Sequence, residues 1–388
     1  MCLAFFAISS IAFDDGSLIS KLSRILIVAG TITEFGKNRI QLTGFHAWLL
    51  GFAGIVFISR FWAFDPSAAS EIFKTVAFNV ICFGCVAFLL YRDKRRIRLV
   101  MGCMVVAPLL LEVRVISIGG VFAYFSHRTV GSINSNALGL FASIALYFAF
   151  LFWREKKQIC WILFMALNLA AALLSASRKA LMVVCLVAIL ITLFDSKTKT
   201  AFGKLSKLLI VVAIILFALF LVMNVPFLYE LIGVRMQGMM SGLLGSGNDV
   251  DASTSTRMQL IDYGIDWFRN RPLVGYGGDN FKALMAAYHP RQSALYAHNN
   301  YVELLVDYGL LGLLVYYSCY VSIICSAVRN RTQLTFADFT ILCLTLGILI
   351  MDYGNVEYYY RNSQLFIALA WAAIVSCHNR PPLRDSSR

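Results

Sequence analysis

The feature that most constrains the fold is a series of long apolar segments separated by short polar loops. They lie at approximately 2–13, 17–35, 43–59, 71–91, 99–117, 135–153, 159–174, 180–194, 208–224, 301–326, 334–351 and 362–377. Most approach the length of about 20 residues at which an α-helix crosses a bilayer. The stretch from Met1 to Phe13 is shorter and lacks the pattern of a secretory signal, so it is interpreted as a truncated or under-length first helix.

The composition excludes two large classes of protein. The chain has 388 residues, of which 59% are apolar and 14% are charged. Disordered chains have low hydrophobicity, and soluble domains carry about a quarter charged residues. A polytopic membrane protein is the class that remains.

The basic residues of the short loops predict the orientation of these helices, because Lys and Arg stay on the cytoplasmic side of a membrane. One alternating set of loops holds Lys37, Arg39, Arg92, Lys94, Arg95, Arg96, Arg98, Arg154, Lys156, Lys157, Lys197, Lys199, Lys204, Lys207, Arg329, Arg331, Arg380, Arg384 and Arg388. The opposite short loops hold only Arg60, Arg128, Arg178, Lys179 and Arg361. Both termini are therefore expected in the cytoplasm. The net charge of +13 is a topology signal, which excludes a nucleic-acid partner as its cause.

The expected architecture is an all-α transmembrane bundle of about twelve helices. Helices 1–9 would occupy residues 1–224, a large outer loop residues 225–300, helices 10–12 residues 301–377 and a cytoplasmic tail residues 378–388. Within the loop, residues 238–256 are small and polar, which predicts a flexible lead-in. The spacing of apolar residues predicts a helix from Arg257 to Phe268, capped by Ser255 or Thr256 and ended by Asn270-Arg271-Pro272. The glycine-rich stretch 272–281 predicts a turn whose backbone approaches another group closely.

Two basic sites break the charge rule on the outer side. Arg178 and Lys179 follow Ser175-Ala-Ser177 between two apolar helices, where they are either anchors that reach the membrane interface or ligands for an anion. Arg257 is expected in the first turn of the loop helix, where free N–H groups and a guanidinium would suit a phosphate. A solvated arginine that pairs with Asp262 or a lipid headgroup is the alternative for Arg257.

A third outer site lies where the loop re-enters the membrane. His298 and Asn299 precede a helix with two carboxylates, Glu303 and Asp307, one turn apart. Ionisable groups in a bilayer are costly and default to functional candidates. Histidine, with an ordinary pKa of about 6.5, can act as a general base, although an interfacial histidine with a polar cap is the alternative. No cluster of His, Cys and Asp has the spacing of metal ligands, so neither a metal nor another cofactor is expected.

These residues, in this order, resemble the O-antigen ligase and polymerase superfamily. The resemblance rests on Ser175 to Ala180, on Arg257 ahead of Trp267 and Pro272 to Gly277, and on His298-Asn299 followed by Glu303, Asp307, Gly309 and Gly312. Arg128 through Gly131 to Asn136 is similar to an upstream Arg-Gly-Asn element of the family, and Trp62 to Pro66 is similar to another. The resemblance covers most of the chain from about residue 55.

The resemblance implies a metal-independent glycosyltransferase of the GT-C-like class in the bacterial inner membrane. Its donor would be an undecaprenyl-diphosphate-linked oligosaccharide, and its active site would face the periplasm or cell exterior. Arg178 and Arg257, with Lys179 as a possible third group, would bind the donor diphosphate. His298 would take a proton from the acceptor hydroxyl, and Asn299, Glu303, Asp307, Arg128 and Asn136 would support the site.

Two questions remain open from the sequence. The acceptor is either a growing glycan, as in a polymerase, or lipid A-core or another anchor, as in a ligase; the motifs slightly favour the polymerase. Membrane lipids are expected partners, and a chain-length regulator would be an additional one. A polysaccharide flippase is the non-enzyme alternative, but a transporter would place its charged residues near the bilayer midplane rather than at one side.

Overall fold

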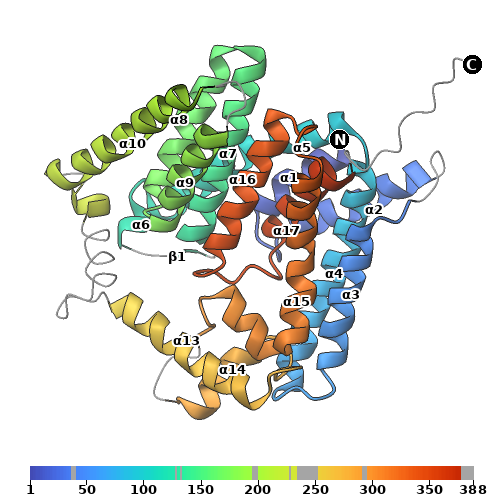
Figure 1. Cartoon of the computed structure of the whole chain (residues 1–388). Helices are drawn as coiled ribbons and strands as arrows, with labels where there is room; N and C mark the ends of the chain where they lie inside the picture. The colour runs from blue at the N-terminus through green and yellow to red at the C-terminus, as the bar shows by residue number, and fades with distance from the viewer. Residues whose placement is uncertain are drawn as a thin grey trace, which may run out of the picture. The chain divides into compact units, whose positions relative to one another are not determined.

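The computed structural model of the chain describes residues 1–35, 41–126, 129–131, 133–194, 200–226, 229–233, 252–290 and 295–376. These residues are almost entirely helical (Figure 1). They form two compact units: unit 1 comprises 1–101, 263–345 and 352–388, and unit 2 comprises 102–262 and 346–351. Three helices, α5, α13 and α16, have residues in both units.

Unit 1 contains the first and last helices of the chain. Its elements are α1 (Cys2–Ala12), α2 (Leu18–Phe35), α3 (Gly44–Ser59), α4 (Pro66–Leu90), the start of α5 (Lys94–Gly119), the end of α13 (Ala252–Asn270), α14 (Asn280–Tyr288), α15 (Asn300–Arg329), most of α16 (Phe336–Met351), α17 (Arg361–Ala370) and η2 (Trp371–Ser376). Helix α3 packs against α4 and α15, while α17 packs against α1 and α4.

Unit 2 is built around α7 (Ser135–Lys156), which packs against α8 (Ile159–Leu174) and α9 (Arg178–Phe194). Its other elements are the rest of α5, α6 (Ala123–Ser126), α10 (Ala201–Asn224), η1 (Tyr229–Gly233), the start of α13 and the end of α16. A hairpin of two short antiparallel strands, β1 (Thr129–Val130) and β2 (Ile133–Asn134), leads into α7. This hairpin is a small departure from the all-α expectation.

Each of the twelve apolar segments contains a helix, so the expected all-α membrane fold is confirmed in its coarse form. Among the described residues, four helices are long and apolar enough to cross a membrane: Pro66–Leu90, Lys94–Gly119, Ser135–Lys156 and Asn300–Arg329. Of the other helices, α10 spans 24 residues and α1 spans only eleven. The number of helices that cross the membrane remains a prediction.

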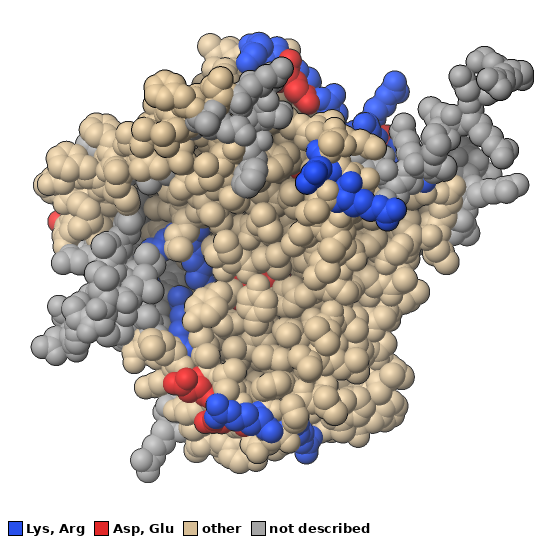
Figure 2. Space-filling view, in the orientation of Figure 1, with Lys and Arg blue, Asp and Glu red and all other residues tan. Residues whose placement is uncertain are grey.

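The outer face of α3, α4 and α15 exposes large apolar side chains. Leu50, Phe78, Ile81, Leu311 and Leu314 are each more than half exposed. In Figure 2 this part of unit 1 is tan across its middle, and the charged side chains in view lie toward its ends. Because exposed apolar area of this extent is costly in water, the surface fits a lipid environment.

The loop helix α13 begins earlier than the sequence predicts. It starts at Ala252 rather than behind a cap at Ser255 or Thr256, and it ends at Asn270 as expected. Arg257 is therefore in the second turn, and the predicted meeting of its guanidinium with the free N–H groups of the first turn is wrong. The stretch 252–256 contains neither Gly nor Pro, so nothing in it stops the helix from extending. Residues 238–251 of the predicted lead-in lie outside the described residues.

Helix α15 is broken at Gly309, whose φ of 65° and ψ of −165° are not helical. The glycine-rich stretch after α13 supplies hydrogen bonds at this break. The N–H groups of Tyr276 and Gly277 donate to the carbonyl oxygens of Val306 and Asp307, both at 2.8 Å. Irregular backbone at membrane depth is tolerated only where such partners exist. The predicted close approach of residues 272–281 is confirmed, and its target is the backbone of α15.

The second half of α15 also donates hydrogen bonds to the stretch after α13. The N–H groups of Leu310 and Leu311 donate to the carbonyl oxygens of Pro272 and Leu273, at 2.8 and 3.2 Å. A Cβ on Gly309 would overlap the backbone of Leu273 and Val274. Only glycine therefore fits this position, because the conformation and the space both exclude a side chain.

The loop before α4 joins the same assembly. The N–H of Phe64 donates to the Tyr276 carbonyl oxygen at 2.8 Å, and the backbone N–H of Asp65 donates to the Asn280 side-chain oxygen. Asp65 also caps α4, and hydrogen bonds from the Ser67 hydroxyl and amide lower the pKa of its carboxyl below the ordinary 3.8. The contribution of this cap to stability is thus present at neutral pH and is lost as the pH falls through the lowered pKa.

We predict that Gly309→Ala destabilises the protein by at least about 1–3 kcal/mol, because a left-handed alanine is strained and its Cβ meets backbone. Thermal unfolding of the purified protein in detergent measures the effect. Gly51→Ala on α3 is the matched control, since a Cβ there meets nothing within 4 Å. Equal melting temperatures for the two variants would contradict the assigned role of the break.

Candidate functional site

His298 lies in a strained turn directly before α15. Its φ of 52° is in the left-handed region, which side chains rarely adopt. The His298 ring packs on the Tyr296 ring, with centroids 3.9 Å apart, and the side chain is half-buried. Strained residues persist where surrounding contacts hold them, and they cluster at functional sites.

Two predicted supporting residues hold this turn. Asn299 caps α15, since its side-chain oxygen accepts from the N–H groups of Tyr301 and Val302 at 3.0 and 3.2 Å. The Glu303 carboxylate turns back and accepts from the N–H of Ala297 at 2.6 Å. The residues on both sides of His298 are thus fixed to the first turn of α15. Glu303, which is 1% exposed, has a positioning role in this geometry.

Asp307, the second carboxylate of α15, caps a different helix. Its Oδ1 accepts from the N–H groups of Asn280 and Phe281 at 3.0 and 3.2 Å, and its Oδ2 accepts from the N–H of Asp279 at 2.9 Å. The Tyr358 hydroxyl also donates to Oδ2, at 3.0 Å. Asp307 therefore satisfies the first N–H groups of α14, where Asp279 makes no side-chain cap.

A fully buried amide, Asn300, connects α15 to the segment after α16, and the sequence reasoning missed it. Its N–H donates to the Asp352 carbonyl oxygen at 2.8 Å, and its side-chain oxygen accepts from the N–H groups of Glu357 and Tyr358 at 2.9 and 3.2 Å. Burial raises the pKa of the Asp352 carboxyl well above its ordinary value. The only signal in the sequence was the Asn299-Asn300 pair, of which the second residue has this role.

The predicted groups of unit 2 meet at the start of α9. Ser175 and Ser177 are buried, and Ala176 between them has a left-handed φ of 49°. The Ser177 hydroxyl donates to the Asn136 side-chain oxygen at 2.9 Å. Arg178 and Lys179, both half-buried, follow in the first turn of α9. Asn136, which the family resemblance names as a supporting residue, therefore lies beside the Ser175–Lys179 motif in unit 2.

Close packing of α7 fixes this hinge. Gly139, one turn beyond Asn136, lies against Ser175, Ser177 and Ala180, and a Cβ there would overlap the Ser175 hydroxyl and the Ala180 methyl. The Ser143 hydroxyl of α7 donates to the Ala180 carbonyl oxygen at 3.1 Å. A rigid helix pair thus sets the position from which Arg178 projects.

The remaining predicted residues divide between the units. Arg257 belongs to unit 2, whereas His298, Asn299, Glu303 and Asp307 belong to unit 1. Arg128 lies outside the described residues. Arg178 and Arg257 are in one unit and His298 is in the other, and joint binding of one donor by the three residues remains a prediction.

Two other basic residues that break the charge rule have structural partners. The Arg60 guanidinium stacks on the rings of Phe57 and Phe73, at 4.7 and 4.9 Å from their centroids. Arg361 is 4% exposed, forms an ion pair with Asp15 and donates to the Phe13 carbonyl oxygen at 3.0 Å. These contacts hold both guanidinium groups, and Arg60 Nε and Arg361 Nη1 are buried without a hydrogen-bond partner among the described residues.

Comparison with known families identifies the central part of the chain. Residues 163–317 match the family model described as O-antigen ligase. This segment is similar to O-antigen ligases. The match confirms the resemblance, and the apolar helices agree with a membrane protein of ligase or polymerase type in glycan biosynthesis. A comparison with curated proteins finds no match.

The matched segment contains most of the predicted site. It spans α9, α13, α14 and the first part of α15, with Arg178, Lys179, Arg257, His298 and Asp307. Asn136 lies outside the matched residues, as does Arg128. In the described part of the chain, no three His, Cys, Asp or Glu side chains gather as metal ligands would.

We predict that Asp307→Ala exposes the start of α14, because three N–H groups lose one acceptor. Hydrogen–deuterium exchange at residues 279–281 is expected to speed up by at least about tenfold. Asp266→Ala, which removes only an exposed ion pair with Arg269 at 3.0 Å, is the control. Unchanged exchange in Asp307→Ala would show that these amides have another partner.

Proposed function

We propose that the protein transfers a glycan from an undecaprenyl-diphosphate-linked donor to an acceptor sugar hydroxyl in cell-surface polysaccharide synthesis. The observation that supports this most strongly is the held, left-handed turn that presents His298 within the segment matched to the O-antigen ligase family. The proposed location is the bacterial cytoplasmic membrane, with the reaction on its outer face. The excess of Lys and Arg in the opposite loops supports that orientation.

In the proposed reaction, the acceptor oxygen attacks the anomeric carbon of the donor sugar. The bond between that carbon and the diphosphate oxygen breaks, and the lipid diphosphate leaves with the electron pair. The His298 imidazole accepts the proton of the acceptor hydroxyl, which is general-base catalysis. Asn299 rather than His298 provides the side-chain cap of α15.

Arg178, Arg257 and Lys179 are the proposed diphosphate ligands. The leaving group gains negative charge as the bond breaks, so fixed cations stabilise the transition state more than the ground state. Buried Ser175 and Ser177 and the Asn136 contact hold the Arg178 backbone in place, which supports a preorganised cation. Arg257 would act from the second turn of α13 through its guanidinium alone.

The acceptor decides between a polymerase and a ligase. A polymerase extends the glycan on another lipid-linked chain, whereas a ligase attaches the finished glycan to lipid A-core or another anchor. We keep the polymerase slightly favoured on the Ser177–Leu181 and His298–Leu305 motifs, with a chain-length regulator as a further proposed partner. A deletion strain separates the two: single repeats joined to the anchor indicate a lost polymerase, and unattached long chains indicate a lost ligase.

We predict that His298→Ala fails to restore the glycan profile of that deletion strain, with a loss of at least about 100-fold in product. Gel analysis of the glycan and immunodetection of the membrane-inserted chain are the measurements. His289→Ala is the control, since His289 stacks on Tyr263 beyond α14 and has no proposed role. Full restoration by His298→Ala would remove the general base from the proposal.

We predict that Arg178→Ala lowers transfer by about 100-fold, the size of effect when one preorganised donor to a developing anion is removed. Arg178→Lys is expected to recover part of this loss only if charge rather than bidentate geometry is needed. Initial rates measured against donor concentration test this prediction. Arg154→Ala is the control, because Arg154 lies in the last turn of α7, at the end opposite Asn136. Equal rates for wild type and Arg178→Ala would contradict the assigned role.

A further inference from the structure

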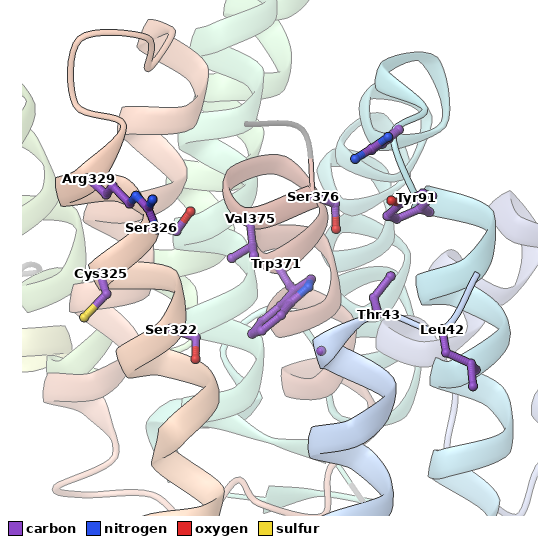
Figure 3. Close-up of a pocket in the computed structure, with 12 residues that line it drawn as sticks. Leu42, Thr43, Tyr91, Ser322, Cys325, Ser326, Arg329, Trp371, Val375 and Ser376 are labelled. Carbon is purple, nitrogen blue, oxygen red and sulfur yellow. The ribbon is translucent and has the colours of Figure 1, made fainter. Parts of the chain in front are cut away.

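Unit 1 contains a cavity of about 540 Å³ that the proposed reaction does not use (Figure 3). It lies between the start of α3, the end of α4, the end of α15 and η2. Helix α15 begins beside His298 and reaches the cavity at Arg329, thirty residues along. The part of α15 after the break at Gly309 has about 20 residues and is about 30 Å long at 1.5 Å per residue, so the cavity is separate from the His298 turn.

The walls of the cavity are positively charged. Arg92 and Arg329 both line it, and none of its twelve lining residues is acidic. Asp93, next to Arg92, is engaged elsewhere, in an ion pair with Arg96 at 3.1 Å. Arg329 makes no ion pair or hydrogen bond with any described residue. An anion that enters the cavity therefore meets two guanidinium groups and no carboxylate among the twelve lining residues.

Two further donors in the lining lack protein partners among the described residues. The indole N–H of Trp371 and the hydroxyl of Ser376 donate to no described acceptor, although both residues are only 8% exposed. Figure 3 shows Trp371 at the centre of the lining, with Ser322 and Ser326 facing it from α15. The two donor atoms are accessible rather than fully buried, so each can donate to a molecule in the cavity.

The cavity also has apolar walls that continue onto the lipid-facing surface. The Trp371 ring packs on Gly44, within 3.0 Å of where a Cβ would be, and Leu42 and Val375 complete this side. Leu42 is 76% exposed, and Val328, one residue before Arg329 on α15, is 63% exposed. A molecule that fills the cavity can therefore place an anionic head against the arginines and an apolar tail along these side chains.

We propose that this cavity binds the headgroup phosphate of an anionic phospholipid. Basic pockets between membrane helices are known to accept such headgroups. Arg92 and Arg329 neutralise the phosphate, while Trp371 and Ser376 donate hydrogen bonds to its oxygens. The acyl chains leave past Leu42 and Val328. The charge pattern assigns this end of α15 to the cytoplasmic side, where anionic headgroups of the inner leaflet are available.

Native mass spectrometry with short-chain phosphatidylglycerol, titrated into the detergent-purified full chain, tests the proposal. Each arginine is expected to contribute about fivefold to affinity, so Arg92→Ala/Arg329→Ala is expected to bind about 25-fold more weakly. Arg95→Ala/Arg331→Ala is the matched control, because it removes the same charge within three residues of Arg92 and Arg329 but outside the cavity lining. Its affinity is expected to equal that of the wild type.

A single conservative substitution and two other ligands test the proposal further. Trp371→Phe keeps the ring and removes the N–H, so it is expected to weaken phosphatidylglycerol binding severalfold even if the double variant fails to fold. Phosphatidylcholine is expected to bind at least about tenfold more weakly than phosphatidylglycerol. Equal losses in the two arginine pairs, equal binding of the two lipids, or inorganic phosphate that binds as tightly as the lipid would each overturn the proposal.

Discussion

The break in α15 at Gly309, and the loop that docks on it, is the constraint on which unit 1 depends. A broken helix in a membrane leaves N–H and carbonyl groups that must be paired. The stretch from Pro272 to Gly277 pairs them, and the Asp307 carboxylate, two residues before the break, caps α14 in the same contact. The loop between the ninth and tenth apolar segments is thereby fixed to the helix that begins at His298. A turn that presents His298 can be rigid only because the helix behind it is anchored in this way.

The sequence predicted where the charged residues lie better than it predicted what their side chains do. The rule that intramembrane carboxylates are functional candidates selected Glu303 and Asp307, and both are engaged in holding backbone. Spacing alone could not reveal this, because the partners of Asp307 lie 26 to 51 residues away along the chain. The same holds for Arg361, whose partner Asp15 is near the other end of the sequence. The roles of these residues depend on contacts between segments far apart in the sequence, and sequence patterns do not reveal such contacts.

The helices were easier to predict, because each apolar segment marks itself by composition. The start of α13 was not, since Ser253 to Thr256 can cap a helix or continue it, and the choice depends on surroundings. Left-handed conformations were also beyond prediction at Ala176 and His298, where neither residue signals a positive φ. Both positions fall in the motifs that resemble the O-antigen ligase family. Strain held by buried neighbours is thus a physical property that the two halves of the proposed site share.

The central claim is that this chain is itself the enzyme that breaks the bond between a glycan and its lipid diphosphate. The most direct measurement uses the purified wild-type protein in nanodiscs, with a chemically defined undecaprenyl-diphosphate-linked repeat unit and an acceptor glycan. We expect product glycan and free undecaprenyl diphosphate to appear in equal amounts, with no other protein added. A donor that stays intact under these conditions, or that is moved across the bilayer unchanged, would contradict the account.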